Sequence, residues 1–518
     1  MRKSSLFFIV VLSVLLAGCR KADKSIVIFF DNDVHCAVDG YPYFAGLRST
    51  VDQDTAYVAM VSSGDYIQGG TIGSISRGEA IMSIIKEIGY DAMAMGNHEF
   101  DYDVQHIQNL AGDTDAPLVC ANLVDNEGKN VFAPYRICQY GNRKVGYIGV
   151  TTPNTYLSKP AAFQDLQGNV LYDFHRFDLY EHVQKTIDEV RKQADYVIVL
   201  SHLGEDPDSI GITSHKLIAA THGIDALMDA HTHSYVTPRQ IKNDMGEGVW
   251  LAQTGDLFNN AGKLVIGKDG TLSMELVKIF ANKDGMDNCP VDAHIKQYVD
   301  SIVSYYSQIT EMPVGQCDFD LIIEDELGNN IVRVKDTNAG NLVTDAMREF
   351  AQTDIAFTNG GGIRNSVKAG NLKRGDIIAM LPYENNVCSF TITGQQLQSV
   401  LEASVKPLPA LNGSFLQISG MEMEVRVLAD RDNEVSNVKV LNQKTQKYEA
   451  IKMDGTYSVA VTDYLLINEN FNVMDKNFPD LVNHHVLSSD VVIDFINTNC
   501  NGKVPSKYAN AETRIKFK

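Results

Sequence analysis

The sequence predicts an α/β protein of two or three domains, and three observations support this prediction. The chain has 518 residues, more than one domain of ordinary size. Its first half alternates short apolar runs with amphipathic stretches, a pattern typical of strands and helices around a central sheet. A polar break at residues 281–290 then separates this half from a second unit with its own helix and strand patterns.

The first domain is expected to span residues 25–285. Its predicted strands are the apolar runs at residues 26–30, 57–61, 92–95, 145–150, 196–200, 224–230 and 249–252. Helices are predicted between these strands, for example at residues 79–88 and 178–191. The first of these helices gains one apolar face from residues that recur at helical spacing, namely Ile81, Ile84, Ile85 and Ile88.

A connecting helix is predicted at residues 291–311, where Ile295, Tyr298 and Ile302 recur at helical spacing. The second domain is expected to follow over residues 313–518. It contains a helical pattern, a glycine-rich turn and several β-rich runs, at residues 341–350, 359–362, 390–393, 421–428 and 457–461. This mixture indicates an α+β domain.

The composition excludes two classes of protein. With 45 basic and 65 acidic residues, the formal net charge is −20. A protein that binds nucleic-acid polymers regardless of sequence needs a basic surface that displaces counterions from phosphates, so we expect no such partner. The eight cysteines include no CxxC pair and are too few for a disulfide scaffold, so buried free thiols are the simpler interpretation for most of them.

The N-terminus has the pattern of an export signal over residues 1–18. Arg2 and Lys3 precede an apolar run at residues 6–16, which is shorter than the roughly 20 residues of a membrane-spanning helix. The run ends in Leu-Ala-Gly-Cys, which resembles a bacterial lipobox and implies that Cys19 is lipidated. We therefore expect an exported lipoprotein that is anchored to a membrane and faces the periplasm or the cell exterior; the alternative is an ordinary cleaved signal.

Residues that commonly bind metals follow five of the predicted strands. Ten of the thirteen histidines precede residue 234. The ligand-type residues after the strands are Asp33, His35, Asp65, Asn97, His202, His231 and His233. In an open α/β sheet, ligands bind outside the carboxyl ends of the strands, so we expect these side chains to converge at one edge.

Carboxylate, amide and imidazole ligands without thiolates favour Mn²⁺, Zn²⁺ or Mg²⁺. In the DxH and HxH pairs, side chains two residues apart on an extended segment point the same way and can share one ion. Seven ligands suit two divalent ions, which together clamp the attacking and leaving oxygens of an in-line displacement. The sequence therefore predicts a dimetal site that hydrolyses a phosphate ester.

Five sequence blocks also resemble the calcineurin-like metallophosphoesterases. They are Asn-Asp-Val-His at residues 32–35, Gly-Asp at 64–65, Gly-Asn-His-Glu-Phe-Asp at 96–101, Ser-His at 201–202 and His-Thr-His at 231–233. The stretch from Gly64 to Asp101 specifically resembles the 5′-nucleotidase family, which includes periplasmic UDP-sugar hydrolases. This resemblance implies a metallophosphoesterase sandwich, a linker helix and a C-terminal substrate-binding domain.

The resemblance also implies roles for individual residues. Asp65 would bridge two ions, one held also by Asp33, His35 and His233, and the other also by Asn97, His202 and His231. His98 and Asp101 would form a catalytic dyad, in which His98 stabilises developing charge and Asp101 orients its ring.

The likeness extends into the second domain through the blocks at residues 341–346, 359–364, 375–377 and 381–383. There Arg364 would contact the substrate's anionic group, Phe415 and Phe471 would sandwich the nucleobase, and Asp475 would bond the ribose. The implied activity is hydrolysis of nucleoside 5′-monophosphates. The alternatives are a 2′,3′-cyclic-nucleotide phosphodiesterase, a UDP-sugar hydrolase, or a surface lipoprotein that binds nucleotides or a host partner without catalysis.

Overall fold

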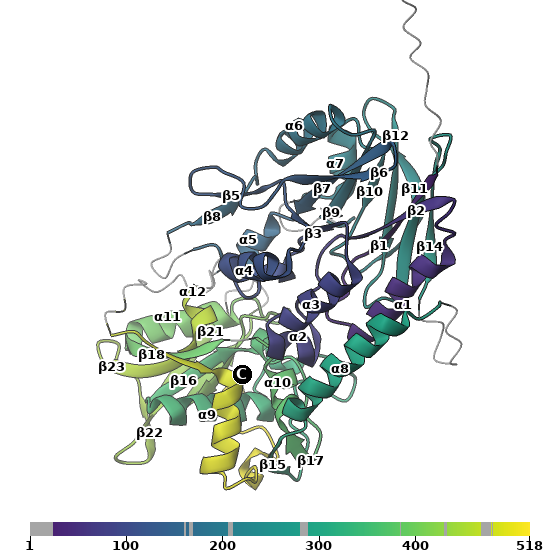
Figure 1. Ribbon diagram of the computed structural model, residues 1–518. Coiled ribbons are helices and arrows are strands. Elements are labelled where there is room, and N and C mark those ends of the chain that lie inside the picture. Colours follow the sequence, from purple (N-terminus) through teal and green to yellow (C-terminus); the bar gives the residue numbers. More distant parts are fainter. Residues whose placement is uncertain are drawn as a thin grey trace, which may run out of the picture.

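A computed structural model describes residues 24–159, 162–164, 169–205, 211–279, 289–383, 385–428, 433–467, 478 and 480–518. Three residues singled out in the sequence, Cys19, Phe471 and Asp475, lie outside this described part. The predicted fold class is confirmed: an α/β sandwich is followed by a helix and a separate mixed domain (Figure 1). Within the described part of the chain, no helix combines the length and apolarity needed to cross a membrane.

Two six-stranded sheets form the first domain. The first sheet has the order β14 (Leu272–Lys278), β13 (Asn260–Ile266), β1 (Ser25–Asp31), β2 (Ala56–Ser62), β3 (Ala92–Ala94) and β4 (Leu118–Val119). The second has the order β11 (Tyr235–Lys242), β12 (Gly248–Thr254), β10 (Ala226–Met228), β9 (Tyr196–His202), β7 (Arg143–Thr151) and β6 (Tyr135–Tyr140). Strands β1 to β4 are parallel, as are β12, β10, β9 and β7, whereas the other strands pair antiparallel at the edges.

The central strands are apolar on both faces. Ile28 and Phe30 of β1 share one hydrophobic core with Ile198 and Leu200 of β9, between the two sheets. The intervening Phe29 faces the opposite way, into a core shared with α1 (Tyr41–Gly46), α3 (Glu79–Ile88) and α4 (Val104–Thr114). On the far side, α6 (Leu179–Arg191) and α7 (Ser214–Ala220) cover the second sheet. Because both faces are buried, each strand appears in the sequence as a continuous apolar run.

Helix α8 (Ala293–Thr310) connects the domains (Figure 1). The Asp292 carboxylate caps its N-terminus, accepting the backbone N–H groups of His294 and Ile295 at 3.0 Å each. The first half of α8 packs on the first domain's core. Its end meets α10 (Arg374–Met380), where a Cβ added to Gly375 would lie 2.9 Å from Thr310 Cβ. One helix therefore contacts both domains.

The second domain contains a five-stranded and a four-stranded sheet. The first has the order β19 (Leu416–Ser419), β16 (Ile355–Asn359), β23 (Thr456–Thr462), β18 (Asn386–Thr393) and β24 (Val482–Leu487). The second has the order β22 (Lys447–Ala450), β21 (Glu434–Asn442), β20 (Met421–Arg426) and β25 (Ile515–Phe517). Helices α9 (Asn338–Ala351) and α13 (Ser488–Asp494) share one core, and α11 (Gly394–Val405) lies in another.

Shorter elements complete the chain. They are α2 (Gly70–Ser76), α5 (Asn154–Ser158), α12 (Asp463–Ile467), the strand pair β5 (Leu123–Asp125) and β8 (Tyr172–Phe174), and the pair β15 (Pro313–Cys317) and β17 (Gly370–Lys373). Helix α5 matters for the site below, because it is followed directly by a largely buried lysine, Lys159.

Candidate active site

The seven ligand-type residues lie at the carboxyl ends of parallel strands from both sheets. Asp33 and His35 follow β1, Asp65 follows β2 and Asn97 follows β3. His202 is the last residue of β9, and His231 and His233 follow β10. The topology therefore delivers side chains from five segments to one edge of the sandwich, which we call the metal rim.

The centre of the rim consists of two carboxylates and one imidazole, all fully buried. His202 Nε2 lies 3.2 Å from Asp65 Oδ2 and 3.9 Å from Asp33 Oδ1. His202 Nδ1 donates to the Ser63 carbonyl at 2.8 Å, so Nε2 is the ring nitrogen that faces the rim. That Nε2 is buried and has no hydrogen-bond partner among the described residues. A buried nitrogen facing two carboxylates without a hydrogen bond is the arrangement expected of a metal ligand.

His35 and His233 give the same indication. Their Nε2 atoms are 3.1 Å apart, and His35 Nδ1 donates to the Gln68 carbonyl at 3.1 Å. Each of Asp33, His35, Asp65 and His233 can offer one ligand atom, and these atoms lie within 4.8 Å of one another. This donor set of carboxylate and imidazole groups fits a divalent cation.

The remaining ligand-type residues lie next to this group. His231 Nδ1 is 2.9 Å from Asn97 Oδ1, and the rings of His231 and His202 have centroids 5.2 Å apart. The His231 backbone N–H also donates to Asp33 Oδ2 at 3.0 Å. All seven predicted ligands are thus brought together at the rim.

The rim loops adopt an unusual backbone. Five ligand positions have a left-handed conformation, with φ of 51° at Asp33, 43° at His35, 60° at Asp65, 82° at His231 and 53° at His233. Such conformations cost about 1–3 kcal/mol each for residues with a side chain and cluster at functional sites. The surrounding packing holds these side chains in their converging orientation at the expense of local backbone energy.

Burial and neighbouring charges shift the pKa values of the rim histidines in different directions. Burial lowers the pKa of His35 to about 4, with His98 and His233 acting in the same direction, so the ring is neutral and able to bind metal. Burial alone would lower the pKa of His202, but Asp65 and Asp33 outweigh it and raise the pKa to about 10. The positive charge of His202 in turn lowers the pKa of Asp65 despite its burial. A cation bound at the rim would replace this proton.

The predicted dyad lies beside the ligands. His98 Nδ1 is 2.8 Å from Asp101 Oδ2, and the His98 and His35 rings have centroids 5.3 Å apart. The backbone N–H of His98 donates to Asp65 Oδ1 at 2.8 Å. His98 therefore reaches the rim through a ring that is oriented by Asp101 rather than by a cation.

Glu99 is a contributor that the sequence reasoning missed. Its buried carboxylate accepts the backbone N–H groups of Gly96 (2.6 Å), Asp65 (2.8 Å), Tyr66 (2.7 Å) and Ile67 (3.2 Å). It thereby ties the loop after β2 to the loop after β3. The two loops approach so closely that a Cβ on Gly96 would lie 2.1 Å from Asp65 Oδ1, so only glycine fits there. The Gly-Asn-His-Glu string contains Glu99, but the sequence does not reveal that the carboxylate points inward to the two loops.

The second-domain predictions have a different outcome. Arg364 is exposed and follows the turn Gly360–Gly362; among the described residues, no hydrogen bond or ion pair joins its side chain to the rim. Phe415 is 0% exposed and lies within a hydrophobic core of the second domain. Stacking of a base on Phe415 would first require exposure of this ring, so that role stays a prediction.

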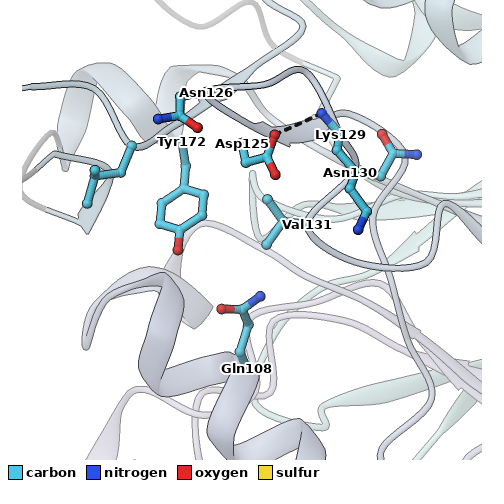
Figure 2. Close-up of a pocket in the computed structure, with 8 residues that line it drawn as sticks. Gln108, Asp125, Asn126, Lys129, Asn130, Val131 and Tyr172 are labelled. Atoms are coloured by element: carbon cyan, nitrogen blue, oxygen red, sulfur yellow. Dashed lines mark hydrogen bonds between the residues drawn. The ribbon is translucent and has the colours of Figure 1, made fainter.

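A separate cavity of about 340 Å³ lies between α4 and the β5–β8 pair (Figure 2). It shares no residue with the rim. Its lining residues are Gln108, Asp125, Asn126, Lys129, Asn130, Val131, Leu171 and Tyr172. The Asp125 side chain accepts the backbone N–H of Lys129 at 2.9 Å, as Figure 2 shows, so this carboxylate closes a turn.

Comparisons with known proteins agree with this geometry. Residues 26–235 match the calcineurin-like phosphoesterase family, and residues 313–476 match the 5′-nucleotidase C-terminal domain. The chain is 24% identical to the 5′-nucleotidase of Vibrio cholerae over 495 residues, covering 88% of this chain and 84% of the relative.

Two further proteins are similar. The trifunctional nucleotide phosphoesterase YfkN of Bacillus subtilis is 26% identical over 484 residues, which cover 85% of this chain but only 32% of that longer relative. The crystal structure of a 5′-nucleotidase precursor from Thermus thermophilus has the same fold, with a TM-score of 0.66, 24% identity, and coverage of 95% of this chain and 99% of that chain. The chain is thus a metal-dependent phosphoester hydrolase that belongs to the 5′-nucleotidase family.

Proposed function

We propose that the protein hydrolyses nucleoside 5′-monophosphates to nucleoside and phosphate, using two divalent ions at the metal rim. The carrying observation is the buried His202 Nε2, which faces Asp65 and Asp33 without a hydrogen bond, beside a second set of facing imidazole nitrogens. Asp33, His35, Asp65 and His233 would hold one ion, and Asp65, Asn97, His202 and His231 the other. The nucleotide substrate is supported by relatives named 5′-nucleotidase.

The residues of the rim and the dyad have distinct tasks in this proposal. Divalent cations would neutralise the phosphate's charge and activate a water molecule as the nucleophile. His98 is oriented through its Nδ1–H by Asp101, which leaves Nε2 to hydrogen-bond the phosphate or the leaving oxygen. Glu99 fixes the loops that carry Asp65 and Asn97. The second domain would supply the contacts to the nucleoside.

The test is phosphate release from AMP by the purified protein with Mn²⁺, Zn²⁺ or Co²⁺. We expect release that stops on chelation and that falls by about 10²–10⁴-fold in His98→Ala, the range for loss of a general acid–base group. Metal content by mass spectrometry should remain unchanged in that variant, because His98 is not a ligand in the proposal. Absence of release from every phosphoester tried would contradict the enzymatic function.

A second substrate class is worth separating, because one relative is named a trifunctional nucleotide phosphoesterase. The same assay should compare AMP with a 2′,3′-cyclic nucleotide and a UDP-sugar at equal concentrations. A kcat/KM for AMP at least tenfold above the others would support the proposal. A higher value for the cyclic nucleotide would replace it with a phosphodiesterase function. Nucleotide binding without turnover would indicate the non-catalytic alternative.

We also propose that the protein is exported and anchored by lipid at Cys19. The support is the N-terminal pattern of basic residues, a short apolar run and Leu-Ala-Gly-Cys. Expression in a bacterial host with labelled palmitate should label the wild type and not Cys19→Ser. The variant should also move from the membrane fraction to the soluble fraction; membrane retention without label would contradict the lipid anchor.

A further inference from the structure

We propose that Lys159 is a positioning residue for the His98–Asp101 dyad, so that the functional unit is a lysine–aspartate–histidine triad. The inference rests on phosphoester hydrolysis at the rim, not on which ester is the substrate. Lys159 follows α5 directly and lies 58 residues from Asp101 in the sequence. None of the sequence blocks that resemble known phosphoesterases contains it.

The ammonium group of Lys159 reaches three groups of the dyad loop. It donates to Asp101 Oδ1 and to the backbone carbonyl of Asn97 at 3.0 Å, and it lies 3.2 Å from His98 Nδ1. The lysine side chain is only 18% exposed and the Asp101 side chain 6%. A largely buried ammonium persists where hydrogen bonds replace its water, and both hydrogen bonds of Lys159, to Asp101 Oδ1 and to the Asn97 carbonyl, go to one short loop.

Counting donors and acceptors fixes how these groups are arranged. Asp101 Oδ2 is 2.8 Å from His98 Nδ1 and Asp101 Oδ1 accepts from Lys159, so each carboxylate oxygen has its own donor. Because Lys159 donates to Oδ1, it leaves Oδ2 free to accept from the imidazole, and with the proton on Nδ1 the approach of Lys159 Nζ to that nitrogen is not a hydrogen bond. The carboxylate is therefore held from both sides, and His98 keeps its proton on Nδ1 and its lone pair on Nε2.

The backbone contact extends the effect to the metal rim. Asn97 offers its carbonyl to Lys159 while its side-chain oxygen lies 2.9 Å from His231 Nδ1. One ammonium thus ties the end of α5 both to the dyad and to a predicted ligand. Without it, Asp101 would keep a single donor and could rotate, and the imidazole would lose its fixed direction. Small misplacements of this kind cost turnover more than binding.

The first test compares Lys159→Met with Lys159→Arg, and uses Lys263→Met as the matched control. Lys263 forms an ion pair with Glu275 on β14, outside the dyad, at 2.9 Å. For Lys159→Met we expect kcat to fall about 10–100-fold, the range for residues that orient active-site groups, with a much smaller change in KM. Lys159→Arg should recover part of the loss because it keeps the charge and the donors. A Lys159→Met enzyme with unchanged kcat would overturn the proposal.

A double-mutant cycle separates positioning from an independent role. If Lys159 acts through His98, Lys159→Met should cause no further loss in the residual activity of His98→Ala, because residues that act as a unit are non-additive. The same loss in both backgrounds would overturn the proposal and indicate that Lys159 acts on its own. Metal content and thermal unfolding of each variant show whether a loss arises from misfolding; where Lys159→Met misfolds, Lys159→Gln takes its place.

A spectroscopic measurement does not depend on any substrate. In the metal-free protein, the hydrogen-bonded Nδ1 proton of His98 should give a downfield proton NMR signal that is absent in His98→Ala. We expect this signal to persist in Lys263→Met and Lys159→Arg and to weaken or vanish in Lys159→Met. An unaltered signal in Lys159→Met would contradict the positioning role. If the wild type hydrolyses no phosphoester, the proposed function fails while this readout still judges Lys159.

Discussion

Each domain contains a buried charged cluster, and the two clusters differ in how far their groups are satisfied. In the second domain, Asp345 on α9 lies 3.0 Å from both terminal nitrogens of Arg514 and accepts hydrogen bonds from Ser419 (2.5 Å) and Tyr508 (2.7 Å). At the metal rim, by contrast, two carboxylates and several imidazoles face one another, and a buried nitrogen has no hydrogen bond.

The backbone shows the same difference. Asp345 lies in the middle of a regular helix, whereas five rim ligands require a left-handed backbone. A network in which every polar group is paired contributes to the fold by itself, and an incompletely paired one shows where a ligand is needed. We therefore assign the Asp345–Arg514 cluster to stability and the rim to function, and the following experiments test this distinction.

The largest effect on the free energy of unfolding is expected from a substitution in the fully hydrogen-bonded Asp345–Arg514 cluster. Asp345→Ala removes the buried carboxylate that pairs with Arg514 and leaves only the exposed Glu512 as its ion-pair partner, which should destabilise the protein by about 3–5 kcal/mol in urea unfolding. Asp490→Ala is the control, because it removes a half-exposed partner of Arg374 and should cost less than about 1 kcal/mol. Equal destabilisation by the two variants would contradict the structural role of Asp345.

A substitution of a ligand-type residue at the rim should lower activity rather than stability. Asp65→Asn removes the charge of the carboxylate that would bridge the two ions, and we expect kcat/KM to fall on the order of 10²–10³-fold, comparable with losing one preorganised electrostatic group. The free energy of unfolding of the metal-free protein should fall by less than in Asp345→Ala, because the buried partner of Asp65 is the His202 imidazolium, which can lose its proton when the carboxylate is replaced, whereas a guanidinium cannot. Marked destabilisation of the metal-free variant would remove the contrast between the clusters.

Added divalent cations should stabilise the protein through the rim. A ligand that binds the folded state at 100 times its Kd raises the free energy of unfolding by about 2.7 kcal/mol. We expect a higher melting temperature with Mn²⁺ or Zn²⁺ in the wild type and in Asp345→Ala, and no increase in Asp65→Asn. A chelator should return the wild type to its metal-free value. An unchanged melting temperature at every ion concentration would argue against a metal site.

Glu99 should have a smaller effect on turnover. Glu99→Gln keeps the shape of the side chain but replaces one of the oxygens that accept backbone N–H groups with a donor. We expect activity to fall about 10–100-fold, as for residues that orient ligands. Glu87→Gln, an exposed partner of His294, is the matched control and should retain full activity. Wild-type metal affinity together with wild-type kcat in Glu99→Gln would show that the loop is held by other contacts.

The smallest effect concerns pH. Burial alone would raise the pKa of Asp345, but Arg514 outweighs it and lowers the pKa below its ordinary value. The resulting stabilisation is present above the pKa of an unfolded aspartate, about 4, and is lost as the pH falls through the lower folded value. The unfolding free energy of Asp345→Asn should accordingly depend less on pH than that of the wild type below about pH 4, measured by urea titration.

The first domain was largely predictable from the sequence because strand runs and metal ligands are distinctive. Each of the seven predicted strands is present, and topology alone explains why residues after β1, β2, β3, β9 and β10 meet. Side-chain roles that depend on packing were not predictable. Phe415 stands in a plausible motif but lies in the core, and Lys159 reaches the dyad from a segment 58 residues away. No local pattern encodes either fact.

The origin of the ligands in two different sheets also has a consequence for the order of assembly. Asp33, His35, Asp65 and Asn97 come from the first sheet, and His202, His231 and His233 from the second. In the proposed assignment each ion takes ligands from both sheets, so a tight ion-binding site would arise only after the two sheets have docked. Metal capture would then follow the folding of the first domain rather than guide it.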